Sequence, residues 1–405
     1  MMTKEVKIPF NTFPVKGIRL GTACAGIKKI NRRDLVLIEL AEGTQTAAVF
    51  TQNAFCAAPV VLSKKHLSES EPKYLLINTG NANAGTGAKG LDDALACCKL
   101  VADTASVKIS EILPFSTGVI GEYLPMDKFP AGIKTAYENL SDNNWEDAAF
   151  GIMTTDTIPK AFTEKMSVQG KDITVSGFAK GSGMIRPDMA TMLAYIATDA
   201  KVAKDLLQQC LLEATNHSFN RITVDGDTST NDSAVLMATG RSGIEIEKNS
   251  EIFSEFQRVV TKICEGLAKE MVRDGEGATK LITISVTGCK SESEAKDVAY
   301  TVAHSPLVKT AFFASDPNWG RILAAVGRAG ITEFELDKVN ISLDDVSIVR
   351  NGEKSRDYTE EKGQAVMNKS DITIHIDLAR GNNAVTVWTC DFSYDYVKIN
   401  AEYRT

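Results

Sequence analysis

Along the chain, some apolar residues form short continuous runs, and others recur every three or four positions. This pattern predicts a mixture of strands and helices. Short apolar stretches bounded by turn residues predict strands at Leu35–Leu40, Ala47–Thr51 and Tyr74–Ile77. Apolar residues three and four positions apart predict a helix at Ile252–Met271, and Leu91–Ala105 is a second predicted helix after a glycine-rich loop. The predicted elements do not alternate strictly, so we expect an α+β fold with tightly joined lobes.

Two alternating stretches near the end of the chain predict a β-hairpin. Its arms would be Asp371–Asp377 and Ala384–Asp391, around a turn at Arg380–Asn383. In the first arm His375 alternates with isoleucines, so its side chain is expected to face away from them. No internal repeat or Pro/Ser-rich linker marks a flexible boundary.

Composition narrows the classes of function. The chain has 405 residues, 43% of them hydrophobic and 24% charged, as in an ordinary globular protein. Its net charge of -7 argues against a nucleic-acid or anionic-membrane partner. The first residues lack the apolar core of a signal peptide, and no apolar run approaches the ~18–20 residues that span a bilayer. We therefore expect a cytoplasmic protein.

Cysteine and histidine placement argues against metal and histidine-based chemistry. The eight cysteines form no C-x-x-C pair, which favours reduced, buried thiols over a zinc site. His66 follows two lysines and is expected on a solvated surface, while His217 and His304 fall near predicted helix ends. With His375, these are the four histidines of the chain, and no H-E-x-x-H or G-x-S-x-G motif is present.

Two segments imitate known ligand loops. Gly85–Gly90 is formally G-x-G-x-x-G, but seven residues, Asn78–Ala84, separate it from the preceding predicted strand, which favours a helix-capping turn over a dinucleotide loop. Asp225–Asp232 imitates the start of a calcium loop. Thr230 and Leu236 stand where such a loop needs glycine and glutamate, so a calcium site is not expected.

The segment Lys180–Asp199 suggests a different chemistry. A glycine-containing stretch precedes Ala190–Thr191, and the apolar run Met192–Ala197 follows directly. If the bond before Thr191 breaks, its new α-amine can act as base for the neighbouring hydroxyl, because an α-amino group has an ordinary pKa of ~7.7–8.0. Such a nucleophile needs no histidine. On spacing alone, a buried strand threonine remains the alternative.

At this segment the sequence resembles the ornithine acetyltransferase family, also called the glutamate N-acetyltransferases or the ArgJ family of arginine biosynthesis. The resemblance covers essentially the whole chain and implies a self-processing N-terminal-nucleophile acyltransferase of the ArgJ/DmpA-like fold. It rests on eight motifs in family order: 77–87, 114–121, 153–157, 180–199, 223–232, 273–280, 312–321 and 399–405.

The resemblance also implies the site residues. Ala190–Thr191 matches the self-cleavage site, so residues 1–190 would become an α chain and 191–405 a β chain. Thr191 would be the nucleophile, and Thr117 and Gly118 match the oxyanion pair. The substrate-binding positions are matched by Thr154, Lys180, Thr191, Glu276, Asn400 and Thr405. On the residues alone, a turn at 117–118, a solvated acid at 276 and a frayed terminus at 400–405 stay open.

The implied reaction is a ping-pong acetyl transfer from N2-acetylornithine to glutamate through acetyl-Thr191, with ornithine released in between. No metal or redox cofactor is implied. Some family members also accept acetyl-CoA, and the resemblance leaves this open. The implied partners are these small molecules, and the chains would associate as an α2β2 heterotetramer. The alternatives are an aminopeptidase or amidase that uses water as acceptor, and a self-processing binding protein without turnover.

Overall fold

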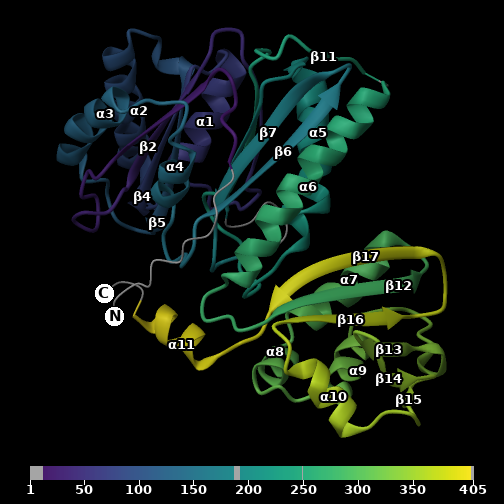
Figure 1. Cartoon of the computed structure of the whole chain (residues 1–405). Coiled ribbons are helices and arrows are strands. Elements are labelled where there is room, and N and C mark those ends of the chain that lie inside the picture. Colours follow the sequence, from purple (N-terminus) through teal and green to yellow (C-terminus); the bar gives the residue numbers. More distant parts are fainter. Residues whose placement is uncertain (1–11, 187–191, 249, 403–405) are drawn as a thin grey trace. The chain divides into compact units, whose positions relative to one another are not determined.

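The computed structural model describes residues 12–186, 192–248 and 250–402. These residues form two compact units (Figure 1). Unit 1 comprises the described residues of Met1–Gly181, Pro187–Asn220 and Asp227–Ala268, and unit 2 those of Ser182–Arg186, Arg221–Gly226 and Lys269–Thr405. This division is distinct from the expected α and β chains, which concern peptide-bond cleavage and stay a prediction.

Unit 1 contains two β-sheets packed face to face. The first has the strand order β1-β2-β4-β5, in which only β4 and β5 are parallel. The second has the order β3-β10-β8-β7-β6, in which only β8 and β10 are parallel. The strands are β1 (Ile18–Ala23), β2 (Leu35–Leu40), β3 (Gln45–Phe50), β4 (Tyr74–Asn81), β5 (Ile112–Val119), β6 (Lys160–Val168), β7 (Lys171–Lys180), β8 (Leu193–Thr198) and β10 (Ser233–Ala238); β9 (Lys201–Val202) pairs with β11 (Glu245–Ile246).

The core between these sheets is formed by inward-facing positions of both sheets together with Trp145 and Ala148. Ile38, Ile77 and Phe115 of the first sheet belong to the same buried cluster as Tyr195 and Val235 of the second. The rings of Phe115 and Tyr195 meet edge to face at 5.4 Å, an arrangement that aromatic pairs prefer. Alternation along each strand thus supplies one face for this core and leaves the other face for helices.

Helices cover both outer faces, which gives unit 1 four layers. Residues of α1, α2 and α3 pack on the first sheet, and α5 and α6 pack on the second. The helix α6 is amphipathic, as predicted, and buries Phe256, Val260 and Leu267. The helices are α1 (Ala58–Glu69), α2 (Gly87–Ala105), α3 (Phe129–Glu138), α4 (Trp145–Gly151), α5 (Lys204–His217) and α6 (Glu251–Arg273), whose last residues belong to unit 2.

Unit 2 is one six-stranded sheet with helices on one face. Its strand order is β15-β14-β13-β16-β12-β17, and isoleucines of β12 and β16 form a buried cluster with α7, α8, α9 and α10. The elements are β12 (Leu281–Cys289), α7 (Glu292–Ala303), α8 (Pro306–Phe313), α9 (Trp319–Gly327), β13 (Asn340–Leu343), β14 (Val346–Arg350), β15 (Glu353–Lys354), α10 (Glu360–Met367), β16 (Asp371–Asp377), β17 (Asn383–Cys390) and α11 (Tyr394–Ala401). The predicted α+β class is confirmed.

The predicted hairpin near the end of the chain is wrong, although its two strands exist. β16 and β17 do not pair with each other, because β12 lies between them, parallel to β16 and antiparallel to β17. The connection crosses the end of β12, where Leu378 N–H donates to Thr287 O at 3.1 Å and Arg380 N–H to Gly288 O at 2.8 Å. Alternating strands show which face is buried but do not show the neighbour.

The surface position expected for His66 is also wrong. Its side chain is 3% exposed, and Nδ1 lies 2.7 Å from Ile112 O, so it packs between α1 and β5. His375 is exposed on β16, as predicted. Six of the eight cysteines are buried, whereas Cys24 is exposed and Cys56 is half-buried. No helix among the described residues is long and apolar enough to cross a membrane.

Candidate active site

Thr117 and Gly118 lie near the end of β5, where this strand runs against β4. Gly118 is opposite Gly80 and has a φ of 138°. A Cβ atom on Gly118 would lie 2.2 Å from the carbonyl carbon of Gly80, so this close approach of two strands requires glycine. The alternative of a turn is wrong, since both residues belong to a strand.

Lys180 ends β7 and reaches the same place. Its side chain is buried, and Nζ donates to Thr117 Oγ1 at 3.3 Å. Lysine has only donors, so the Thr117 hydroxyl accepts here and keeps its own proton for donation. The structure therefore brings together two residues that are distant in sequence and that the family resemblance had assigned to one site.

A buried aspartate that the sequence analysis missed holds this region together. The Asp156 carboxylate accepts from Lys160 Nζ at 2.7 Å, from Gly181 N–H at 2.8 Å and from Thr154 N–H at 3.0 Å. Burial by itself raises the pKa of this carboxyl, but the cations of Lys160 and Lys180 outweigh burial and hold the pKa well below its usual range. An ionised Asp156 thus fixes the backbone at two predicted substrate-binding segments.

Thr154 is held from a second side. Arg32 Nη2 donates to the carbonyls of Met153 at 2.7 Å and Thr154 at 3.0 Å. The signal for this cluster was present in the sequence. Asp156 lies within the motif at 153–157, and Lys160 follows it by four residues. Spacing alone could not show that both side chains are buried.

Glu276 and Asn400 form the second group of predicted site residues, in unit 2. Glu276 lies in the loop after α6 and is 8% exposed, and its Oε2 accepts from Asn400 Nδ2 at 2.8 Å. A Cβ atom on Gly183 would lie 2.4 Å from the Glu276 carboxyl carbon. The alternative of a solvated acid at 276 is wrong, since Glu276 is buried. Asn400 lies in α11, while the rest of the alternative of a frayed terminus at 400–405 falls mostly on residues 403–405, outside the described residues.

The residues just before the proposed cleavage site are anchored in unit 2. Ser182 O accepts from Glu276 N–H at 2.8 Å, and Val224 N–H donates to Ile185 O at 2.9 Å. The Asp225 carboxylate accepts from the backbone of Met184 at 2.6 Å and of Ile185 at 2.9 Å. The first acid of the calcium-like segment therefore binds backbone amides. Among the described residues, no group of three or more His, Cys, Asp or Glu could hold a metal ion.

The two groups of predicted residues belong to different units. Thr117, Gly118, Thr154 and Lys180 lie in unit 1, and Glu276 and Asn400 lie in unit 2. Ala190, Thr191 and Thr405 lie outside the described residues. The segment 85–90 leads into a helix, as predicted, but it is not a capping turn: α2 already begins at Gly87, and its N-cap residue Thr86 makes no side-chain capping hydrogen bond.

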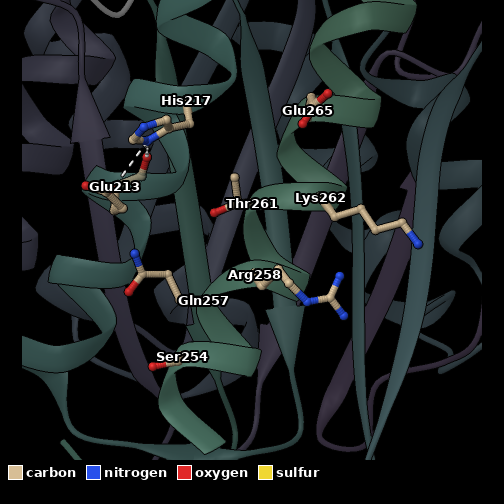
Figure 2. A pocket seen from close by; sticks show the side chains of 8 residues that line it. All are labelled: Glu213, His217, Ser254, Gln257, Arg258, Thr261, Lys262 and Glu265. Carbon is tan, nitrogen blue, oxygen red and sulfur yellow. Dashed lines mark hydrogen bonds and ion pairs between the residues drawn. The ribbon is translucent and has the colours of Figure 1, made fainter. Parts of the chain in front are cut away.

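A polar cavity of about 570 Å³ lies between α5 and α6 of unit 1 (Figure 2). None of the predicted site residues lines it. Its side chains have partners nearby: His217 Nδ1 lies 3.2 Å from Glu213 Oε1, and Arg258 Nη2 forms an ion pair with Glu255 Oε1 at 2.6 Å. Its lining residues are Glu213, His217, Ser254, Gln257, Arg258, Thr261, Lys262 and Glu265. The cavity is thus a solvated groove beside the sheet rather than part of the acyl-transfer site.

The family resemblance implies an acyl-transfer enzyme, and two features are compatible with that class: the contact of the buried Lys180 with Thr117 in unit 1, and the buried Glu276 carboxylate in unit 2. Comparison with known proteins places the chain within this class. The model of the ArgJ family matches residues 19–405, and the chain belongs to this family.

Relatives named arginine biosynthesis bifunctional protein ArgJ are similar over nearly their whole length. The one from Methylococcus capsulatus is 56% identical over 393 residues, covering 97% of this chain and 96% of the relative. The one from Pseudomonas fluorescens is 54% identical over 394 residues, covering 97% of each. A solved structure of the protein of the same name from Bacillus halodurans is 41% identical with a TM-score of 0.50, and covers 52% of this chain and 99% of the solved chain.

Proposed function

We propose that this chain is a glutamate N-acetyltransferase of arginine biosynthesis that moves the acetyl group of N2-acetylornithine to glutamate. The observation that carries this proposal is the 54–56% identity, over 97% of the chain, to relatives named arginine biosynthesis bifunctional proteins. The same identity disfavours the aminopeptidase or amidase alternative.

In the proposed reaction, Thr191 Oγ attacks the acetyl carbonyl of N2-acetylornithine. The amide C–N bond breaks, and ornithine leaves with the proton that the hydroxyl gave up. The α-amine of glutamate then attacks the acetyl ester, the ester C–O bond breaks, and N-acetylglutamate leaves while the proton given up by the amine returns to Thr191 Oγ. The base is the α-amine that self-cleavage after Ala190 creates, and no metal or redox cofactor takes part.

The described side chains fit the charges of this reaction. Lys180 donates to the Thr117 hydroxyl, which leaves the hydroxyl proton for the developing oxyanion next to Gly118. The buried Glu276 carboxylate, oriented by Asn400, suits the side-chain ammonium of ornithine. Thr154 and Thr405 complete the proposed substrate contacts.

Self-cleavage also has support in chain length. The solved chain from Bacillus halodurans is covered over 99% of its length by 52% of this chain, which is about the share that either cleavage product would have. We further propose an α2β2 heterotetramer in the cytoplasm. Light scattering of the purified protein should then give about twice the 43.8 kDa of one chain.

Intact-mass analysis with and without N2-acetylornithine tests the proposal. Purified protein should consist of two chains, with the β chain starting at Thr191, and only the β chain should gain an acetyl group. Addition of glutamate should remove that group as acetylglutamate. Thr191→Ala should stay uncleaved and inactive. Release of free acetate without acetylglutamate would favour the amidase instead, and an uncleaved but active protein would refute the mechanism.

A second donor is part of the proposal because the relatives are named bifunctional. We propose that acetyl-CoA also acetylates Thr191. Incubation of the processed protein with acetyl-CoA alone should give the same acetyl-β-chain mass, and Thr191→Ala should give none. If only N2-acetylornithine acetylates the wild-type protein, the enzyme has a single donor.

A further inference from the structure

Asn231 and Asp232 are buried residues of unit 1 that the proposed reaction leaves without a role. They lie directly before β10, inside the motif at 223–232, and are 7% and 1% exposed. Buried polar side chains of this kind need hydrogen-bond partners. Their partners lie on two different elements of the candidate site.

Asp232 holds the start of β8. Its Oδ1 accepts from Met192 N–H at 2.7 Å, and the next residue, Ser233, donates its N–H to Met192 O at 3.0 Å. Both backbone groups of Met192 are therefore fixed by residues 232 and 233. Met192 directly follows Thr191, the proposed nucleophile, in the sequence.

Asn231 holds the strand that carries the proposed oxyanion pair. Its Nδ2 donates to Ser116 O at 2.9 Å and to Ala82 O at 2.7 Å. The Ser116 carbonyl and the Thr117 N–H belong to one planar peptide unit. Fixing that carbonyl therefore fixes the backbone of β5 at Thr117, whose hydroxyl is the proposed oxyanion donor.

The two residues cannot move independently, because Thr51, the residue directly after β3, binds their segment at two points. Thr51 N–H donates to Asp232 O at 2.9 Å, and Thr51 Oγ1 donates to Ser229 O at 2.8 Å. Asn231 N–H donates to Ser229 Oγ at 3.2 Å. One short buried segment thus connects the end of β5 with the start of β8.

We propose that Asn231 and Asp232 are positioning residues for acyl transfer. Together they hold the Thr117 peptide and the Met192 amide at a fixed distance and orientation to each other. The inference rests on the proposed function. Catalysis by preorganised groups depends on their relative positions, and a displacement of about 1 Å can lower the rate on the order of 10²-fold.

Single-turnover acetylation by N2-acetylornithine and the time course of self-cleavage test this role. Asp232→Ala and Asn231→Ala should each slow both steps by about 10²-fold. KM should stay near the wild-type value, because neither side chain is a proposed substrate contact. Asp232→Asn keeps an acceptor oxygen for Met192 N–H, so it should restore most of the rate with an unchanged pH profile.

Two control variants remove matching contacts elsewhere in unit 1. Asp199 is a buried acid whose Oδ1 accepts from Thr174 N–H at 2.9 Å, and Asn144 Nδ2 donates to the carbonyls of Leu20 at 3.0 Å and Asn139 at 2.8 Å. Asp199→Ala and Asn144→Ala should cleave and react like the wild type at equal folded content, measured by circular dichroism.

Several outcomes would overturn the inference. Wild-type rates in both alanine variants at positions 231 and 232 would do so, as would an equal loss in the two controls. If Asp232→Asn were as slow as Asp232→Ala, charge rather than position would be the role of the carboxylate. Failure of the wild-type protein to take acetyl from N2-acetylornithine would refute the proposed function instead, and self-cleavage would still test the positioning role.

Discussion

Gly183 contacts the carboxylate on which the proposed recognition of ornithine depends. Its φ is not positive, so alanine fits the backbone, but the new Cβ would lie 2.4 Å from the Glu276 carboxyl carbon. We expect Gly183→Ala to displace this carboxylate and weaken ornithine binding by about 1.5–3 kcal/mol, the usual contribution of a hydrogen bond to a charged group. Calorimetric titration of the processed protein with ornithine measures the loss.

A matched control is Gly327→Ala at the end of α9, in the same unit. A Cβ atom there meets nothing within 4 Å, so ornithine affinity should not change. Equal affinity in the Gly183 and Gly327 variants would show that the Glu276 carboxylate does not bind the ligand.

Asp156 should stabilise unit 1 as well as the site, because it compensates a fully buried lysine. The side chains of Asp156 and Lys160 have no exposed surface, and removing one partner of such a pair costs about 3–5 kcal/mol. We therefore expect Asp156→Asn to lower the thermal unfolding midpoint at pH 7. Asp127→Asn is the control, since Asp127 pairs with Lys128 at the surface and should change little.

The low pKa of Asp156 also predicts that its contribution to stability depends on pH. The folded protein holds the pKa of Asp156 below its ordinary value of 3.8, so the unfolded chain binds its proton at higher pH than the folded chain does. The stabilisation is complete above about pH 5 and is lost as the pH falls through and below 3.8. The difference in unfolding midpoint between wild type and Asp156→Asn should be constant from pH 7 to about pH 5 and narrow below that. A constant difference down to about pH 3 would contradict it.

Histidine should not be the catalytic base. Burial, together with Arg186, Lys309 and Arg328, lowers the pKa of His304 to about 4, and its Nε2 lies 3.0 Å from Thr223 Oγ1. Between about pH 6.5 and 4, His304 binds a proton in the unfolded chain but not in the folded protein. Its contribution to stability therefore falls as the pH drops through that range. Acetyl-enzyme formation at about pH 8, near the ordinary pKa of an α-amine, should survive His304→Gln and the same change at the other three histidines. Loss in any folded variant would identify a histidine base.

The site residues divide into those that sequence could reveal and those that it could not. Thr117, Lys180 and Glu276 stand in family motifs, so the resemblance named them. Asp156 and Asn231 stand in motifs too, but their importance comes from burial and from the backbone groups that they bind. Such contacts depend on which strands become neighbours, and residue spacing does not encode that.

At the scale of elements, the start of α2 shows how context reverses an ordinary propensity. Glycine inside a helix normally costs about 1 kcal/mol relative to alanine. A Cβ atom on Gly90, however, would lie 1.8 Å from Thr86 Oγ1 and 2.5 Å from Asn83 Oδ1. We expect Gly90→Ala to destabilise the protein by about 1–3 kcal/mol through overpacking. Urea unfolding measures the change, and a stabilised variant would show that the turn is not rigid.

The bounds of elements were predicted well where the spacing of apolar residues determines them. The choice of neighbouring strands was predicted poorly. β2 has the predicted bounds, and α6 extends beyond the predicted helix by one residue at the start and two at the end. The hairpin failed because β12 entered between β16 and β17, bringing Ile282, Ile284 and Val286 beside the isoleucines of β16. The pattern of β16 is the same with either neighbour, so only the fold could choose.

At the scale of the whole molecule, the proposed cleavage would divide one sheet between two chains. β3, β6 and β7 precede the bond after Ala190, and β8 and β10 follow it. β7 pairs with β8 from Val175 opposite Thr198 to Lys180 opposite Leu193, and β3 pairs with β10 over its whole length. Cleavage therefore leaves continuous backbone hydrogen bonds and a shared core between the products.

We accordingly expect the two products to stay together until the protein unfolds. Processed protein should elute from size exclusion as one species that contains both chains on a denaturing gel. High salt should not separate them, because backbone hydrogen bonds and buried apolar surface are far less sensitive to ionic screening than surface ion pairs are. Uncleaved Thr191→Ala should elute at the same volume. Urea should release the two chains only as the near-ultraviolet circular dichroism of the folded core disappears. Separate elution of a β chain in high salt alone would show that the sheet in unit 1 is not shared between the products.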